Sequence, residues 1–192
     1  MRVRAFIFVT ALAAAIEPAA LAADTASPDA RQTISLSGPW EFRRDDEPDT
    51  QWKTVRVPSC FGEHESPDFH SVGWYRKTVA PFVLAAGKRV LIHFEAVATF
   101  AEVWWDGKRI GVHLGGWTPF RFDITDSVRG TDPKHSHELR VRVDERVGHN
   151  TQGFLPIIEP HFGGIWQDVA ILIVPDPFID DLKLFAVIRV PW

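Results

Sequence analysis

Apolar and polar residues alternate over much of this chain, in short runs that are typical of half-buried β-strands. The alternation is most regular over residues 137–144, where three aliphatic side chains share one face and charged side chains share the other. Residues 73–79 alternate in the same way, whereas residues 89–97 are almost continuously apolar, as expected of a central strand covered on both faces. The pattern therefore predicts strands, and it contains no convincing amphipathic helix.

A β-hairpin is predicted near the middle of the chain. Asp106-Gly107 supplies the positive φ angles of a tight turn between a strand ending at Trp105 and a strand over residues 109–113. Further strands are predicted over residues 40–43, 53–57, 120–124, 165–174 and 178–187. Short strands joined by Gly, Pro and Asp turns predict an all-β fold, an antiparallel β-sandwich of jelly-roll type.

This fold predicts that one set of apolar side chains is largely buried, because each lies on an apolar face of an alternating or buried strand. The set is Val103, Phe120, Phe122, Leu139, Val141, Val143, Ile171 and Ile173.

The first residues have the composition of a targeting segment. Arg2 and Arg4 precede an apolar run and small residues that suit cleavage, so we expect residues 1–23 to be a signal peptide and the protein to be periplasmic or secreted. Residues 24–33 are expected to be a disordered linker. No apolar run approaches the roughly 20 residues that span a membrane, so we expect no membrane partner.

Composition and charge favour a carbohydrate partner over a nucleic acid. The formal charge is −4 and the basic residues are scattered, which does not provide the positive field that phosphate backbones require. Eight tryptophans and 14 phenylalanines provide rings of the kind on which sugars stack. The single cysteine, Cys60, excludes an intrachain disulfide and is expected to be a small buried residue rather than a catalytic thiol.

Three sequence blocks resemble the N-terminal sugar-binding domain of glycoside hydrolase family 2, the β-galactosidase and β-glucuronidase group. The longest is V-W-W-D-G-K-R-I-G-V-H-L-G-G-W-T-P-F-R-F-D-I-T over residues 103–125, and G-W-Y-R-K and G-G-I-W-Q-D-V flank it in the same order. The resemblance implies a jelly-roll sandwich like the galactose-binding domains, which we place at residues 34–184. Residues 185–192 would then begin a following segment that is truncated here.

The resemblance also implies where sugar would bind, at loops on one end of the sandwich. Two loops are expected to converge there, residues 59–71 and 145–162. His70 occupies the position of a polar sugar-contacting residue three residues before the G-W-Y block, and Glu159 is nearest to a carboxylate position, with His161 beside it. The expected partner is a terminal β-glycoside, and a solvated loop side chain remains the alternative at each position.

The parent enzymes are retaining β-glycosidases, which need two carboxyl groups roughly 5 to 5.5 Å apart. In the family both glutamates lie in a (β/α)₈ barrel that follows the sandwich and an immunoglobulin-like domain, and a barrel alone takes about 250 residues. We therefore expect this chain to lack catalytic residues and to be inactive alone. The alternative is an autonomous carbohydrate-binding or interaction module without hydrolytic function.

Other chemistry has little support in the sequence, and we expect neither a metal nor a cofactor. His135 and His137 lie one residue apart beside Glu138, but no third ligand follows at a spacing that fixes it against them, so a cupin-like metal site is a minor alternative. No G-x-S-x-G string is present for a nucleophilic serine. His93, within an apolar strand, is expected to be a hydrogen-bonded core histidine.

Overall fold

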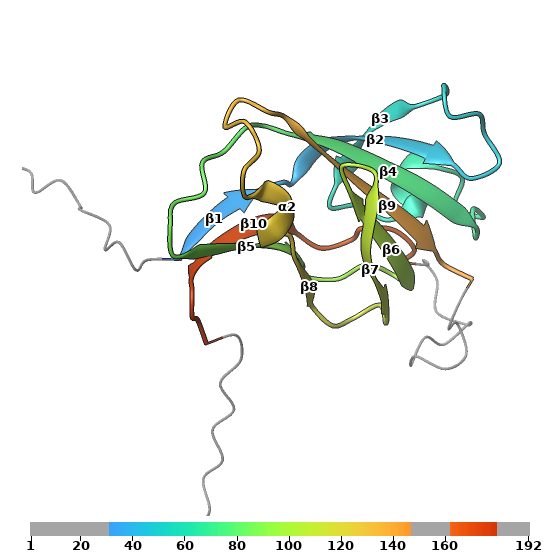
Figure 1. The fold of residues 1–192 in the computed structure, drawn as a ribbon. Helices are drawn as coiled ribbons and strands as arrows, with labels where there is room; N and C mark the ends of the chain where they lie inside the picture. The colour runs from blue at the N-terminus through green and yellow to red at the C-terminus, as the bar shows by residue number, and fades with distance from the viewer. Residues whose placement is uncertain (1–30, 147–161, 180–192) are drawn as a thin grey trace, which may run out of the picture.

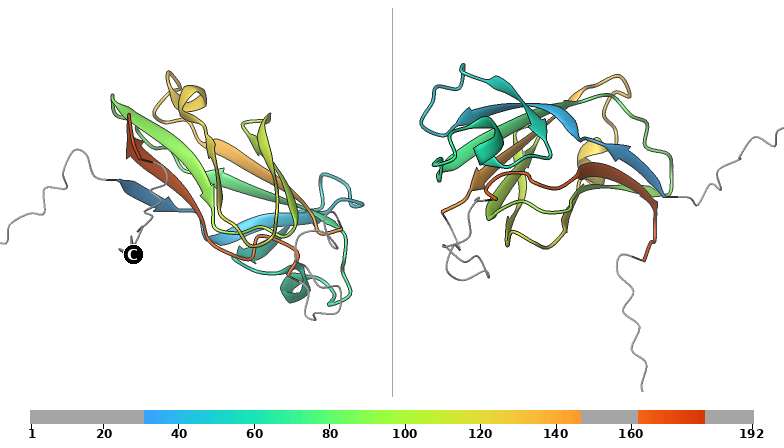
Figure 2. Two further views of the ribbon diagram at one scale, coloured as in Figure 1. Left: turned by 90° about the horizontal axis from the view of Figure 1, so that it is seen from below. Right: turned by 180° about the vertical axis from the view of Figure 1, so that it is seen from behind.

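The structure, a computed structural model, describes residues 31–146 and 162–179, which form two antiparallel β-sheets. In Figure 1, β2 and β4 lie in the upper layer, while β5 and β10 lie in the lower layer, and Figure 2 shows the same arrangement from below and from behind. The prediction of an all-β antiparallel sandwich is confirmed. The jelly-roll connectivity and the limits of the domain stay predictions.

The larger sheet has six strands in the spatial order β3-β2-β4-β9-β6-β7. These strands are β2 (Gly38–Arg44), β3 (Lys53–Val57), β4 (Val72–Val79), β6 (Phe100–Trp105), β7 (Lys108–Leu114) and β9 (His137–Asp144). Strand β9 lies at the centre, where it pairs with β4 on one side and with β6 on the other.

The smaller sheet has four strands in the order β1-β10-β5-β8. They are β1 (Gln32–Ser35), β5 (Lys88–Phe94), β8 (Phe120–Asp123) and β10 (Val169–Pro175). Strand β5 is central, and its last five residues are buried, as the continuous apolar run predicted.

The helices in the described residues are two single turns, α1 (Phe61–His64) and α2 (Thr125–Val128). Turn α1 interrupts the segment 59–71, which the sequence predicted to be a loop without regular structure. Within the described ranges, no helix has the length and apolar character needed to cross a membrane.

Strand β10 begins at Val169, four residues later than the predicted start at residue 165. The reason is that the backbone before it pairs with loops rather than with a neighbouring strand. Gly164 forms an isolated bridge with Ala98, and the carbonyl of Ile165 accepts a hydrogen bond from the N–H of Ser59 at 3.0 Å. The strand predicted over residues 178–187 lies mostly outside the described residues.

The core lies between the two sheets and contains most of the side chains that were predicted to be buried. Val103, Leu139, Val141, Val143 and Ile171 are completely buried, and Ile173 is 5% exposed.

Phe120 and Phe122 are only partly buried, contrary to the prediction. Strand β8, which carries both rings, lies at the edge of its sheet and pairs with β5 alone. An edge strand has a neighbour on one side only, so its side chains have fewer groups to cover them.

One close approach of backbone to side chain depends on glycine. A Cβ atom added to Gly73 on β4 would lie 2.3 Å from Cε2 of Phe42, which is closer than real Cβ atoms approach. Phe42 is completely buried and also packs against Phe61, so its ring has no free space to move into.

We therefore predict that Gly73→Ala lowers the free energy of unfolding by about 1–3 kcal/mol, because the added methyl group overpacks the core. Chemical denaturation measures this change. The control is Gly62→Ala, since a Cβ atom at Gly62 would find its nearest atom at an ordinary 3.9 Å. Equal stability of the two variants would contradict the packing of Phe42 against β4.

Candidate functional site

Phe61 fixes the segment 59–71 against the end of the sandwich. Its side chain is 1% exposed, and its ring centroid lies 5.7 Å from that of Phe42, 6.2 Å from that of Tyr75 and 5.3 Å from that of Phe69. The aromatic cluster thus joins the segment to strands β2 and β4. In turn α1, the carboxylate of Glu63 accepts a hydrogen bond from the backbone N–H of Cys60 at 2.9 Å.

The chain that returns toward β10 passes directly beside this segment. The backbone N–H of Phe61 donates a hydrogen bond to the carbonyl of Gly163 at 2.6 Å. Gly163 cannot carry a side chain here, because a Cβ atom would lie 2.3 Å from Oε2 of Glu145 and 2.8 Å from the ring of Phe61. The glycine therefore allows the backbone to cover the Glu145 carboxylate.

Strand register brings Glu145 next to His70. Val72 pairs with Asp144 at the ends of β4 and β9, and the N–H of Glu145 donates to the carbonyl of Ser71 at 3.2 Å. His70 Nδ1 lies 3.7 Å from Glu145 Oε2, an ion-pair distance. The Glu145 side chain is 1% exposed and that of His70 is 37% exposed, so an exposed imidazole covers a buried acid.

Burial raises the pKa of the Glu145 carboxyl group above its ordinary value. The nearby His70 and a hydrogen bond from the backbone of Gly163 favour the charged form, but they offset the desolvation only in part. A buried carboxyl group with a raised pKa beside a titratable partner is a frequent property of functional sites.

These groups line a pocket with a volume of about 690 Å³. A pocket of this size falls within the range of small-molecule sites. Its lining residues are Cys60, Phe61, Gly62, Glu63, Pro67, Asp68, Phe69, His70, Glu145 and Phe162.

Aromatic rings continue from the pocket onto the neighbouring surface. The centroid of Phe162, in the lining, lies 5.7 Å from that of Trp117 and 5.8 Å from that of Trp166. Trp166 is held by a hydrogen bond from its Nε1 to the carbonyl of Gly116 at 2.9 Å. Trp117 is 53% exposed, so a large ring face remains available beside the pocket.

Of the three site residues predicted from the sequence, the structure places His70 in the pocket wall. Glu159 and His161 lie outside the described residues, and the sugar-contacting roles of all three stay predictions. The two predicted loops meet at their described ends, where His70 faces Glu145 and Phe162 lines the same pocket.

Glu145 was not among the site residues predicted from the sequence, although its position in the alternating pattern of β9 indicated that it faces inward. The inward-facing residues of β9 are Leu139, Val141 and Val143, and the next position with the same parity is Glu145. A carboxylate in an inward register position indicates a buried polar group. The sequence also did not predict that the Trp117 ring is exposed beside the pocket, because this exposure depends on how the β7–β8 connection folds.

Two other side chains in this region are poorly suited to chemistry at neutral pH. Burial and the nearby Glu63 raise the pKa of the Cys60 thiol to about 11, so the reactive thiolate is scarce. Burial lowers the pKa of His64 to about 4, so its ring is neutral. The expectation that Cys60 is not a catalytic thiol agrees with this environment, although the residue is only partly buried.

A second hollow, of about 500 Å³, lies over the smaller sheet and is lined by charged groups that pair with one another. Arg121 Nε donates to His93 Nδ1 at 3.1 Å, and His93 Nε2 lies 2.8 Å from Glu95 Oε1. His93 is 8% exposed, which confirms the prediction of a hydrogen-bonded core histidine. Since Arg121, His93 and Glu95 already pair with one another, this hollow is a weaker candidate for a binding site.

Comparison with known proteins identifies relatives of the whole described domain. Residues 9–175 match the family model of the sugar binding domain of glycosyl hydrolases family 2. This match begins within residues 1–23, which the sequence predicts to be a signal peptide.

Among curated proteins, a β-galactosidase of Thermoanaerobacter pseudethanolicus is 34% identical over 146 residues, covering 70% of this chain and 19% of that protein. A β-glucuronidase of Bacteroides fragilis is 29% identical over 159 residues, covering 79% of this chain and 22% of that protein. The chain thus spans about a fifth of the length of these relatives.

Solved structures share the fold. A β-D-glucuronidase of Dictyoglomus thermophilum matches with a TM-score of 0.64 at 23% identity, covering 78% of this chain and 29% of that chain. A β-glucuronidase of Bacteroides uniformis matches with a TM-score of 0.56 at 26% identity, covering 76% of this chain and 18% of that chain.

Because Glu145 is a buried acid, we predict that the difference in the free energy of unfolding between the protein and Glu145→Gln depends on pH. A raised folded-state pKa means that the contribution of protonated Glu145 to stability is complete below about pH 4.5 and is lost as the pH rises through the folded-state pKa. Glutamine is neutral throughout, so the variant should gain stability relative to the protein as the pH rises from about 4 to 8.

Urea denaturation across this pH range measures the difference in the free energy of unfolding. The control is Asp68→Asn, which neutralises an exposed carboxylate in the same pocket. A difference for Glu145→Gln that stays constant with pH, or that parallels the control, would contradict the burial of this acid.

Proposed function

The chain belongs to the sugar binding domain family of the family 2 glycosyl hydrolases, and from this premise we propose that the pocket beside His70 and Glu145 binds the terminal sugar of a β-glycoside. The observation that carries this proposal is the placement of an exposed imidazole over a buried carboxylate inside that pocket.

The chemistry of the pocket suits a monosaccharide. A sugar ring presents hydroxyl groups around its edge and C–H groups on its faces, so it needs both hydrogen-bonding groups and a ring on which to stack. His70, Glu63 and Asp68 provide the polar groups of the lining. Trp117 and Phe162 provide aromatic surface at its margin.

His70 acts as the direct contact and Glu145 as its positioning residue. The imidazole is exposed enough to reach a hydroxyl group, whereas Glu145 is completely buried and its carboxylate faces His70. An acid fixed 3.7 Å from His70 Nδ1 restricts the orientation of the ring. Restricting the ring before binding reduces the entropy that binding must remove.

The charge of the pocket favours a neutral sugar. Among the described residues of its lining there are three carboxylates and neither lysine nor arginine. An anionic sugar would meet repulsion from Glu63 and Asp68, which no lysine or arginine of the described lining offsets. The named relatives include both β-galactosidases and β-glucuronidases, and for this domain we propose a galactoside-like ligand over a glucuronide.

Hydrolysis by a retaining glycosidase requires more than a sugar-binding pocket. It needs an acid and a nucleophile about 5 to 5.5 Å apart that both reach the glycosidic bond, and among the described lining residues Glu145 is completely buried. We propose that the domain forms one wall of an active site whose catalytic carboxylates lie in other domains of a retaining β-glycosidase. Export through a signal peptide over residues 1–23 is part of the proposal.

Replacement of His70 by alanine should weaken sugar binding more than folding. The variant loses hydrogen bonds to the ligand, each worth about 1 kcal/mol, and we expect the Kd to rise about five- to ten-fold. Titration with methyl β-galactoside, followed by tryptophan fluorescence or NMR, measures the affinity, with methyl β-glucuronide as the comparison ligand.

The control is Lys134→Ala, an exposed residue outside the pocket. Equal losses of affinity and thermal stability in His70→Ala would argue against a contact with the ligand. Absence of binding of either sugar would favour an interaction module over a sugar-binding wall.

The chain alone should release no product from aryl β-galactoside, β-glucuronide, β-mannoside or β-glucoside substrates. The physical reason is that acid and nucleophile must be held on rigid elements at a fixed separation. A chromogenic assay of the purified chain tests this expectation. Turnover that disappears in Glu159→Gln would overturn it.

A further inference from the structure

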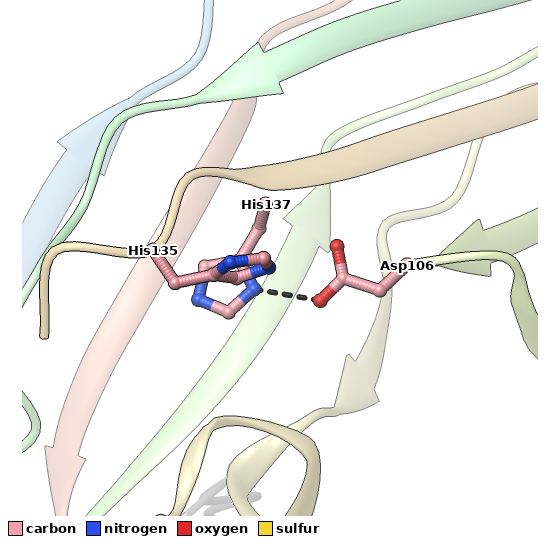
Figure 3. Close-up of side chains that lie close together, drawn as sticks. All are labelled: Asp106, His135 and His137. Carbon is pink, nitrogen blue, oxygen red and sulfur yellow. Dashed lines mark hydrogen bonds and ion pairs between the residues drawn. The ribbon is translucent and has the colours of Figure 1, made fainter. Parts of the chain in front are cut away.

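A second group of functional side chains lies where the β6–β7 hairpin meets the start of β9. It consists of Asp106, His135 and His137, and one potential ligand atom from each residue lies within 4.8 Å of the others. In Figure 3 the two imidazole rings lie next to each other and the Asp106 carboxylate points toward them. The sequence did not predict this group, because its third member comes from a turn about 30 residues earlier in the chain.

The Asp106 carboxylate is held in place by the fold. Asp106 is the first residue of the hairpin turn and has a φ of 49°. Its Oδ1 accepts a hydrogen bond from the backbone N–H of Glu138 at 2.8 Å, and its Oδ2 lies 2.7 Å from His137 Nδ1. The carboxylate is therefore directed at the histidines before any ligand binds.

His137 is equally constrained. It is 3% exposed, and its ring stacks on Trp105 at a centroid distance of 4.7 Å. Phe82 covers it from another side at 5.8 Å. An imidazole fixed by aromatic neighbours and hydrogen-bonded to a carboxylate resembles the supported histidines of metal sites.

The hydrogen bond between Asp106 and His137 does not explain why His135 lies beside them. Its side chain is exposed, and its ring meets that of His137 edge-on at a centroid distance of 4.9 Å. It lies in the segment between α2 and β9, outside any strand, so its side chain is free to adopt another rotamer.

From this geometry we propose that Asp106, His135 and His137 bind a divalent transition-metal ion, with Zn²⁺ as the representative. Two imidazole nitrogens and one carboxylate oxygen suit Zn²⁺ and its neighbours, whereas Ca²⁺ and Mg²⁺ prefer sites made of oxygen alone. Bound nitrogen and oxygen ligands lie about 2.0–2.2 Å from zinc, so His135 must move toward the other two residues when the ion binds. A rotation of the exposed His135 provides this movement, while the ion replaces the proton shared between Asp106 Oδ2 and His137 Nδ1 and these two atoms move slightly apart.

The position of the group indicates a structural role. Strand β9 runs from His137 to Asp144, and the pocket beside Glu145 lies beyond its other end. An ion at Asp106 would thus lie away from the pocket and join the hairpin turn, the start of β9 and the segment before it. Binding to the folded state alone would stabilise the fold in proportion to the logarithm of the ion concentration.

The test uses the full chain after treatment with a chelator. Isothermal titration with Zn²⁺ should show one site that His135→Ala weakens at least about ten-fold, since loss of even a supporting group costs that much. Zn²⁺ should also raise the midpoint of thermal unfolding of the protein and have a smaller effect on the variant, while Mg²⁺ should leave both unchanged. Substitution with Co²⁺ gives a second measurement, because imidazole coordination changes its visible absorption and His135→Ala should remove that change.

His135→Ala is the informative variant because the residue is exposed, whereas replacement of the buried His137 could disrupt folding. The matched control is Lys134→Ala, an exposed neighbour without a metal ligand, which should bind Zn²⁺ like the protein itself. Failure of the protein to bind Zn²⁺ would overturn the proposal. So would equal binding by the protein and His135→Ala, because the ion would then be held by other histidines.

Discussion

The packing of Phe61 against Phe42 and Tyr75 is the interaction on which the candidate pocket depends. A polar segment of more than ten residues cannot hold a fixed position by its own hydrogen bonds in water, because ordering each residue costs about 1–2 kcal/mol of conformational entropy. One buried aromatic side chain offsets part of this cost. Since Phe61 also hydrogen-bonds Gly163, the same residue fixes both loops that form the pocket.

The pocket combines a stabilising aromatic cluster with a destabilising buried acid. Glu145 lies in a position that an aliphatic residue of the same size would fill at lower cost in free energy. Its raised pKa reflects this cost. A group that opposes stability but faces an exposed histidine is better explained by function than by folding, and this arrangement supports a binding role for the pocket independently of the family resemblance.

Strand β9 separates two sites of different chemistry. One end leads to Glu145 and the candidate pocket, and the other begins at His137 beside Asp106. Strand β9 lies near the centre of the larger sheet and pairs with a strand on both sides. Groups at its two ends are therefore held rigidly, while the residues that would contact ligands, His70 and His135, lie on connecting segments where side chains can still adjust.

Alternation and turn chemistry act between near neighbours in the chain, so the sequence was enough to predict the class of fold, the inward face of β9 and the Asp106-Gly107 hairpin. It also indicated His70 through a resemblance. Only the tertiary structure placed Glu145 beneath His70 and Asp106 beside His137. Both pairs join residues far apart in the sequence, so strand order and the path of the connecting segments decide whether they meet, and neither property can be derived from local pattern alone.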